Sequence, residues 1–141
     1  MSDRESEKDK PHVLLVEDYD DAREVCAALL EAQGYRVSTA TNGVEAVEKA
    51  QEEHPDVVLM DLSLPLMDGV TAIQKLKQQG ETKDIPVALM TGHVAGKRSE
   101  DAQSSGCDMV IAKPCMPEEL ESRIKELLAK KPTPATLLKK D

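Results

Sequence analysis

The sequence of 141 residues contains no phenylalanine, no tryptophan and only two tyrosines. A core of this chain must therefore be built from aliphatic side chains and methionine. Hydrophobic residues make up 40% of the sequence, which at this length is enough for one ordinary core. Such an aliphatic composition suits a parallel sheet that is covered by helices on both faces.

Cysteines and long hydrophobic runs are also scarce. The three cysteines, Cys26, Cys107 and Cys115, form no CxxC pair and no even-numbered disulfide set, which favours a reducing compartment. No apolar run is long enough to cross a bilayer. The first ten residues, MSDRESEKDK, lack the apolar segment of a secretory signal. We therefore expect a cytoplasmic protein without membrane contact.

The charge and motif patterns of several function classes are missing. With 18 basic against 27 acidic residues and no basic stripe, direct nucleic-acid binding is not expected. His12, His54 and His93 do not have the spacing of a transition-metal site. The stretch GHVAGKRS at 92–99 is not a phosphate-binding P-loop, because its glycines are too close together and Arg98 replaces the required Ser or Thr.

The sequence does contain an alternation of apolar runs and helical patterns. Four apolar runs have the pattern of buried strands: 12–16, 57–60, 85–90 and 109–112. A fifth, weaker run at 36–40 has the pattern of an edge strand. Helices are predicted at 20–33, from Asn42 to His54, from Asp68 to Gly80 and at 117–129, with a short, loosely held helix at 95–105. This alternation predicts an α/β fold: a doubly wound, five-stranded parallel sheet of order 2-1-3-4-5 with five helices.

Polar residues directly follow four of the predicted strands. They are Glu17 and Asp18, Asp61, Thr91, and Lys113. In doubly wound sheets ligands bind at the carboxyl ends of the strands, so these side chains should meet. Three carboxylates would repel one another unless a cation neutralised them, and oxygen ligands of this kind suit Mg²⁺ with a phosphate group. The pattern predicts a site for Mg²⁺ and an anion such as phosphate.

The ordered segments VED, VVLMDLSLPLMDG, VALMTG and AKP resemble the receiver domain of two-component response regulators, the CheY-like family. The resemblance covers roughly residues 11–129, between a charged tail at 1–10 and a C-terminal tail at 130–141. It implies a phosphoacceptor that assists its own phosphorylation and dephosphorylation but is otherwise not an enzyme. The implied partners are a sensor histidine kinase or histidine phosphotransfer protein and an unknown downstream protein. A stand-alone receiver without an output domain, monomeric or weakly dimeric, is expected.

The resemblance also implies a role for each strand-end residue. The acidic pair falls on Glu17 and Asp18, the phosphoacceptor on Asp61, the switch hydroxyl on Thr91 and the lysine of the family on Lys113. Asp18, Asp61 and the carbonyl of Ser63 would hold Mg²⁺ or Mn²⁺, with Glu17 acting through water. The peptide bond between Lys113 and Pro114 is expected to be cis.

Three residues depart from the family pattern, and two alternatives to a stand-alone phosphorylated receiver stay open. Gly92 replaces the usual alanine, Val110 replaces the aromatic residue of the fifth strand, and Cys115 stands where Phe is frequent. The chain could be the receiver part of a larger hybrid kinase, or a pseudo-receiver that binds partners without phosphate. A phosphatase of the haloacid dehalogenase type is disfavoured, because that family needs a second Asp at position 63, where this chain has Ser63.

Overall fold

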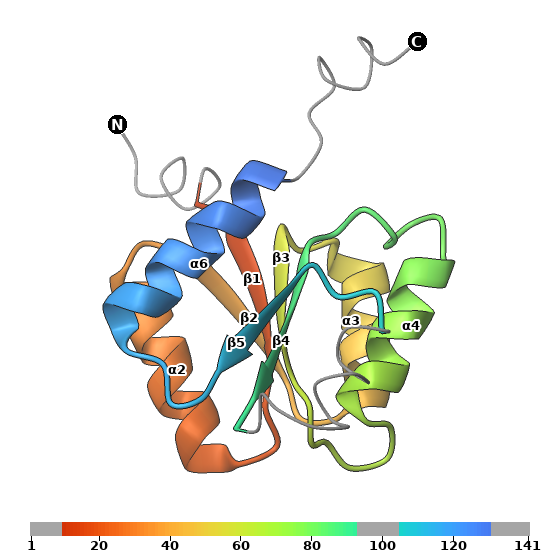
Figure 1. Cartoon of the computed structure of the whole chain (residues 1–141), viewed down its shortest axis with the longest axis horizontal. Helices are drawn as coiled ribbons and strands as arrows, with labels where there is room; N and C mark the ends of the chain where they lie inside the picture. Colours follow the sequence, from red (N-terminus) through yellow and green to blue (C-terminus); the bar gives the residue numbers. More distant parts are fainter. Residues whose placement is uncertain (1–9, 93–104, 131–141) are drawn as a thin grey trace, which may run out of the picture.

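The computed structural model describes residues 10–92 and 105–130, which form a five-stranded sheet with helices on both faces (Figure 1). Its elements are β1 (His12–Val16), α2 (Asp20–Ala32), β2 (Arg36–Ala40), α3 (Gly43–Glu53), β3 (Val57–Asp61), α4 (Gly69–Gln78), β4 (Val87–Thr91), β5 (Met109–Ala112) and α6 (Pro117–Lys130). Every neighbouring pair of strands is parallel, and the order is β2-β1-β3-β4-β5. The predicted fold class and strand order are therefore confirmed.

Alternation of side chains along the strands divides the core into two layers. Helices α3 and α4 cover one face of the sheet, and α2 and α6 cover the other (Figure 1). The first face carries Leu14, Val16, Val58, Met60 and Leu89, and the second carries Val13, Leu15, Val57, Leu59 and Ala88. All residues of β1, β3 and β4 are buried, whereas β2 and β5 are partly exposed, as expected of edge strands.

Two helices begin at the capping residues that the sequence predicts. The side chain of Asn42 accepts a hydrogen bond from the backbone N–H of Glu45, at 2.8 Å, at the start of α3. The side chain of Asp68 accepts one from the N–H of Thr71, also at 2.8 Å, at the start of α4. Each cap satisfies a backbone donor that the helix leaves unpaired. Both helices thus start beside the carboxyl edge of the sheet.

The boundaries of some elements differ from the sequence prediction. β4 begins at Val87 rather than at residue 85, because Pro86 has no N–H to donate to a neighbouring strand. α6 extends to Lys130, one residue into the predicted tail at 130–141. The helix predicted at 95–105 lies outside the described residues except for Ser105, which is in a turn. None of the helices described here is both long and apolar enough to span a membrane.

Candidate functional site

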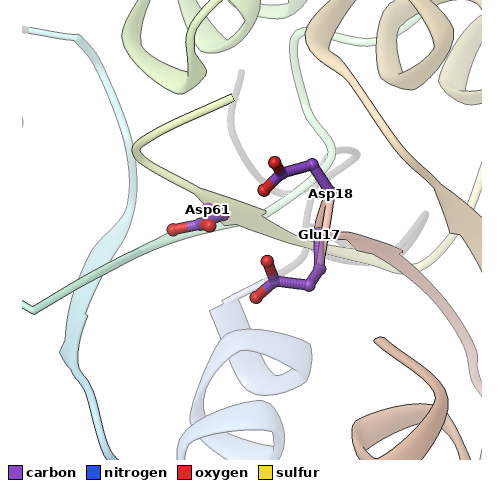
Figure 2. Close-up of side chains that lie close together, drawn as sticks. All are labelled: Glu17, Asp18 and Asp61. Carbon is purple, nitrogen blue, oxygen red and sulfur yellow. The ribbon is translucent and has the colours of Figure 1, made fainter. Parts of the chain in front are cut away.

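Three carboxylates meet at the carboxyl edge of the sheet. Glu17 and Asp18 follow β1, and Asp61 ends the neighbouring strand β3. One oxygen from each of the three lies within 4.8 Å of the others, and the side chains point into a common space (Figure 2). Glu17 and Asp61 are only 6% and 8% exposed, whereas Asp18 is open to solvent. The buried pair and the exposed Asp18 therefore form one acidic cluster at the surface.

Lys113 supplies the positive charge beside this cluster. Its Nζ donates a hydrogen bond to Oε1 of Glu17 at 3.1 Å and lies 3.6 Å from Oδ1 of Asp61. The backbone N–H of Lys113 donates to the carbonyl of Thr91 at 2.9 Å, which fixes the end of β5 against β4. The peptide bond to Pro114 is cis, as the resemblance implies. Lys113 thus bridges two of the three carboxylates.

The cluster is electrostatically unbalanced. Burial raises the pKa of Asp61, and the neighbouring Glu17 raises it further, while Lys113 partly offsets both effects. Burial alone would lower the pKa of Lys113, but Asp61 and Glu17 outweigh it, so the pKa of the lysine is raised. Among the described residues, the three carboxylates pair with one ammonium, so with all four groups ionised the cluster carries two more negative than positive charges (three minus one). An additional cation would therefore be attracted to this edge.

The loop after β3 is folded tightly beneath Asp61. The N–H of Leu62 donates to the carbonyl of Met90 at 2.9 Å, and the N–H of Gly69 returns to the carbonyl of Leu62 at 3.1 Å. A Cβ on Gly69 would lie 2.3 Å from the carbonyl oxygen of Asp61, so the close approach requires glycine. This packing holds Ser63, the residue two past Asp61, beside the cluster.

An open cleft of about 610 Å³ adjoins the carboxylates. Its lining includes Asp18 and Ser63, together with Asp68 and Thr71 from the start of α4. Thr91 ends β4 and is only 2% exposed. All six residues predicted for the site from the sequence therefore lie at the same edge of the sheet.

Arg23 is a residue of this edge that the sequence analysis missed. Its Nη1 donates to the carbonyl oxygen of Glu17 at 3.0 Å, and its Nη2 donates to Oδ1 of Asp20 at 2.6 Å. The guanidinium thereby fixes the backbone that carries the acidic pair. The spacing of Asp20 and Arg23, three residues apart at the start of a predicted helix, is a signal of their pairing in the sequence. The hydrogen bond from Arg23 to the carbonyl oxygen of Glu17 has no comparable signal in the sequence.

The three departures from the family pattern lie at three separate positions. Val110 is on the edge strand β5 and is 37% exposed. Cys115 follows the cis proline and is partly buried against the core layer of α2 and α6. Gly92 is exposed, and a side chain there would meet open space. None of the three contributes to the carboxylate cluster.

A comparison with known protein families identifies one that matches most of this chain. The model of the response regulator receiver domain matches residues 13–125. The chain belongs to this family. The receiver domain described here is 36% identical over 120 residues to the response regulator Rre1 of Synechocystis, a match that covers 84% of this chain but only 52% of Rre1. It is 34% identical over 116 residues to the polar-differentiation response regulator DivK of Brucella ovis, covering 82% of this chain and 94% of DivK.

A solved structure resembles this receiver domain closely. The receiver domain of the sensor histidine kinase PA1611 from Pseudomonas aeruginosa is 29% identical, with a TM-score of 0.82, over 85% of this chain and 98% of that one. That crystal structure has a magnesium ion coordinated in its active-site cleft. The chain thus spans about half the length of some relatives and nearly the whole of others.

Proposed function

We propose that this receiver domain accepts a phosphoryl group on Asp61 and signals by binding another protein. The donor would be the phosphohistidine of a sensor histidine kinase or a histidine phosphotransfer protein. The observation that carries the proposal is the cluster of Glu17, Asp18 and Asp61, with Lys113 paired to two of its members. Since such donors are phosphorylated with ATP, we place the reaction in the cytoplasm.

The chemistry follows from the positions of the side chains. An oxygen of Asp61 would attack the phosphorus in line, a P–O bond would form and the P–N bond to the donor imidazole would break. Lys113, which lies beside Asp61, would stabilise the negative charge of the phosphoryl oxygens. The hydroxyl of Thr91, at the end of the adjacent strand, would donate a hydrogen bond to the phosphoryl group once it is attached.

The donor set of the cluster fits a hard divalent cation. Asp18 and Asp61 would hold Mg²⁺ with the backbone carbonyl of Ser63, and Glu17 would act through water; Mn²⁺ has compatible chemistry. Oxygen ligands, partial exposure and uncompensated negative charge all favour such an ion. When bound, the metal supplies neutralisation of the phosphoryl charge. The magnesium in the related PA1611 receiver domain supports this proposal.

The proposed domain comprises residues 11–129, and its output is a protein–protein interaction of a monomer or weak dimer. Rre1 extends well beyond the matched region, whereas DivK is covered almost completely. A receiver part of a hybrid kinase is a second candidate setting for the same phosphoryl chemistry, which the similarity to the receiver domain of the sensor histidine kinase PA1611 supports. In both settings Asp61 is the acceptor, and the first experiment tests that point.

Substitution of Asp61 by Asn should abolish phosphorylation. The protein is incubated with acetyl phosphate and Mg²⁺, and intact mass spectrometry is expected to show one added phosphoryl group. Asp68→Asn is the matched control, because it makes the same acid-to-amide change in the adjacent cleft while Asn preserves the helix cap. The control should be phosphorylated normally. A phosphoryl group mapped to another residue would refute the assignment, and no labelling of the unaltered chain would favour a phosphate-independent pseudo-receiver.

Removal of the divalent ion should stop the same reaction. Excess chelator is expected to prevent labelling, and added Mg²⁺ or Mn²⁺ should restore it. Asp18→Ala should weaken metal binding strongly, because Asp18 is the exposed member of the cluster and has the least competition from Lys113. Labelling at an unchanged rate in chelator would contradict the proposed role of the metal.

A further inference from the structure

A second cavity includes Lys113 in its lining. It has a volume of about 140 Å³, is partly open to solvent, and is lined by residues of α2, the sheet, α6 and the segment between β5 and α6. Its lining includes Lys113 and Glu17 at the rim, and otherwise consists mainly of apolar and sulfur-bearing side chains. Leu15 and Leu120 contribute the hydrocarbon part of the wall. This space is not used in the proposed phosphoryl transfer.

Three sulfur-bearing residues line the cavity from three separate parts of the chain. Cys26 comes from α2, Met90 from β4, and Cys115 from the segment after the cis proline. All three belong to the core layer between the sheet and helices α2 and α6. The remaining cysteine, Cys107, packs in the opposite layer. Folding therefore gathers two of the three cysteines and one thioether around a single small space.

The sequence explains why this space is open. Cys115 occupies a position at which the resembling family often carries Phe, whose ring is much larger than a thiol. An apolar cavity of this size would ordinarily reduce stability, because its lining atoms lose packing partners. The lining of this cavity contains three sulfur-bearing residues, which could bind a ligand in the space.

The thiols are not suited to act as nucleophiles. Both cysteines are free. Burial raises the pKa of Cys26 to about 11 and also raises that of Cys115, so both are protonated at neutral pH. A ligand that uses them must displace their protons, as a thiophilic metal does.

We propose that Cys26, Cys115 and Met90 form a binding site for a single soft monovalent metal ion of the Cu(I) class. Soft thiolate and thioether ligands favour Cu(I), zinc and iron–sulfur clusters over hard cations such as Mg²⁺. Each cysteine has one side-chain torsion, so a rotamer change can turn its sulfur into the cavity. Two thiolates and one monovalent ion carry a net charge of −1, and the lining also includes Lys113, which is paired with Glu17 at 3.1 Å. The three proposed ligands, Cys26, Cys115 and Met90, have no role in the proposed phosphorylation, but the cavity shares Glu17 and Lys113 with that site.

A zinc site is disfavoured by the same lining. Structural Zn²⁺ takes four ligands from Cys, His, Asp or Glu. Within the described ranges 10–92 and 105–130, the two thiols do not form a close group with a third residue of these types. Glu17, the carboxylate at the rim, is already paired with Lys113 at 3.1 Å. The donors available are therefore mostly soft sulfur.

The test is an anaerobic titration of the full chain with Cu(I), in competition with the chromophoric chelator bathocuproine disulfonate. One equivalent should be bound, with ultraviolet absorption from thiolate-to-copper charge transfer. Cys26→Ser and Cys115→Ser should each weaken binding by at least the factor of about 10–100 known for loss of an outer-shell partner. Met90→Leu, which preserves volume, should weaken it less. Cys107→Ser is the matched control and should bind as the unaltered chain does.

Cys115→Phe separates loss of the site from loss of the fold. It should fill the cavity, retain the circular dichroism spectrum and cooperative melting of the unaltered chain, and lose the bound ion. The inference is overturned if Cu(I) binding requires Cys107, if it persists in a Cys26→Ser, Cys115→Ser double variant, or if Zn²⁺ binds at the same residues with equal affinity. Absence of one-equivalent Cu(I) binding to the unaltered chain would also overturn it.

Discussion

The two edges of the sheet contain the same kinds of charged residue in opposite states of pairing. At the carboxyl edge, three carboxylates share one ammonium group, Lys113. At the amino edge, Asp108 accepts hydrogen bonds from both Lys77, at 2.9 Å, and the backbone N–H of Val87, at 2.8 Å. Among the described residues, the acidic cluster of the carboxyl edge retains uncompensated negative charge, whereas the charge of Asp108 at the amino edge is neutralised by Lys77. The difference separates a site that can attract a ligand from one that holds the fold together.

The amino edge is a structural clamp. Besides its ion pair, Nζ of Lys77 donates to the carbonyl oxygens of Lys83 and Ile85. These contacts connect α4 to the segment before β4 and to the residue before β5. Charged donors and acceptors that are fully used in this way contribute to stability but leave little capacity for a ligand. Pairing, rather than residue type, distinguishes the two edges.

Backbone packing at the two edges gives the largest expected contrast in stability. Gly69→Ala would place a Cβ 2.3 Å from the carbonyl oxygen of Asp61, a backbone atom that cannot move without displacing the acceptor. We expect a loss of about 3 kcal/mol in the free energy of unfolding. Gly80→Ala, near the amino edge, has open space around its Cβ and should change stability by less than about 1 kcal/mol. Urea denaturation measures the free energy of unfolding of both variants. A loss for Gly69→Ala as small as that for Gly80→Ala would show that the carboxyl edge is not tightly packed.

Removal of one aspartate from each edge should change stability in opposite directions. Asp108→Ala deprives Lys77 and the N–H of Val87 of their shared acceptor, and should cost about 1.5–3 kcal/mol. Asp61→Asn removes a buried carboxylate that lies near Glu17, while the pair between Glu17 and Lys113 remains. That substitution should stabilise the metal-free protein by roughly 0.5–2 kcal/mol.

The aspartate comparison is measured by thermal and urea unfolding in the presence of a chelator. The chelator is needed because a bound cation would neutralise the repulsion that Asp61→Asn relieves. The same sign of effect for both substitutions would remove the proposed distinction between a functional and a structural edge. Addition of Mg²⁺ should then narrow the stability gain of Asp61→Asn, since only the unaltered chain keeps the complete donor set.

The sequence was sufficient for those features that depend on local pattern and regular topology. Unbroken apolar runs located β1, β3 and β4, and parallel winding placed the residues after them at a common edge. Capping by Asn42 and Asp68 was predictable because donor and acceptor are three residues apart.

Features that depend on distant side chains were not predictable in this way. Lys77 and Asp108 are 31 residues apart, and nothing in either local segment indicates their pairing. The contact of Arg23 with the carbonyl of Glu17 depends on how α2 leaves the sheet. The sulfur-lined cavity combines Cys26, Met90 and Cys115 across most of the chain. Such contacts are set by tertiary packing, which single-sequence patterns do not encode.

A histidine at the amino edge gives the smallest expected effect and extends the comparison to pH. His12 is 5% exposed; its Nε2 lies 2.7 Å from Oγ of Ser38 and 3.5 Å from Oε1 of Glu53. Burial and the nearby Arg36 lower its pKa, and Glu53 and Asp56 only partly oppose them. The histidine of the unfolded chain therefore binds a proton at a higher pH than His12 of the folded chain does. The contribution of His12 to the free energy of unfolding should be complete above pH 6.5, and it should be lost as the pH falls from 6.5 toward the lowered pKa of the folded state.

Replacement of His12 by Gln should therefore flatten the acid side of the stability profile. Urea midpoints measured at pH 7.5, 6.5 and 5.5 are expected to fall more steeply for the unaltered chain than for His12→Gln. His54→Asn is the control, because His54 is exposed and its left-handed backbone at φ 50° is tolerated by Asn. The control should follow the profile of the unaltered chain. If His12→Gln also follows the profile of the unaltered chain, protonation of His12 does not affect the stability of the amino edge. His12 then contributes to that edge only through packing and hydrogen bonding.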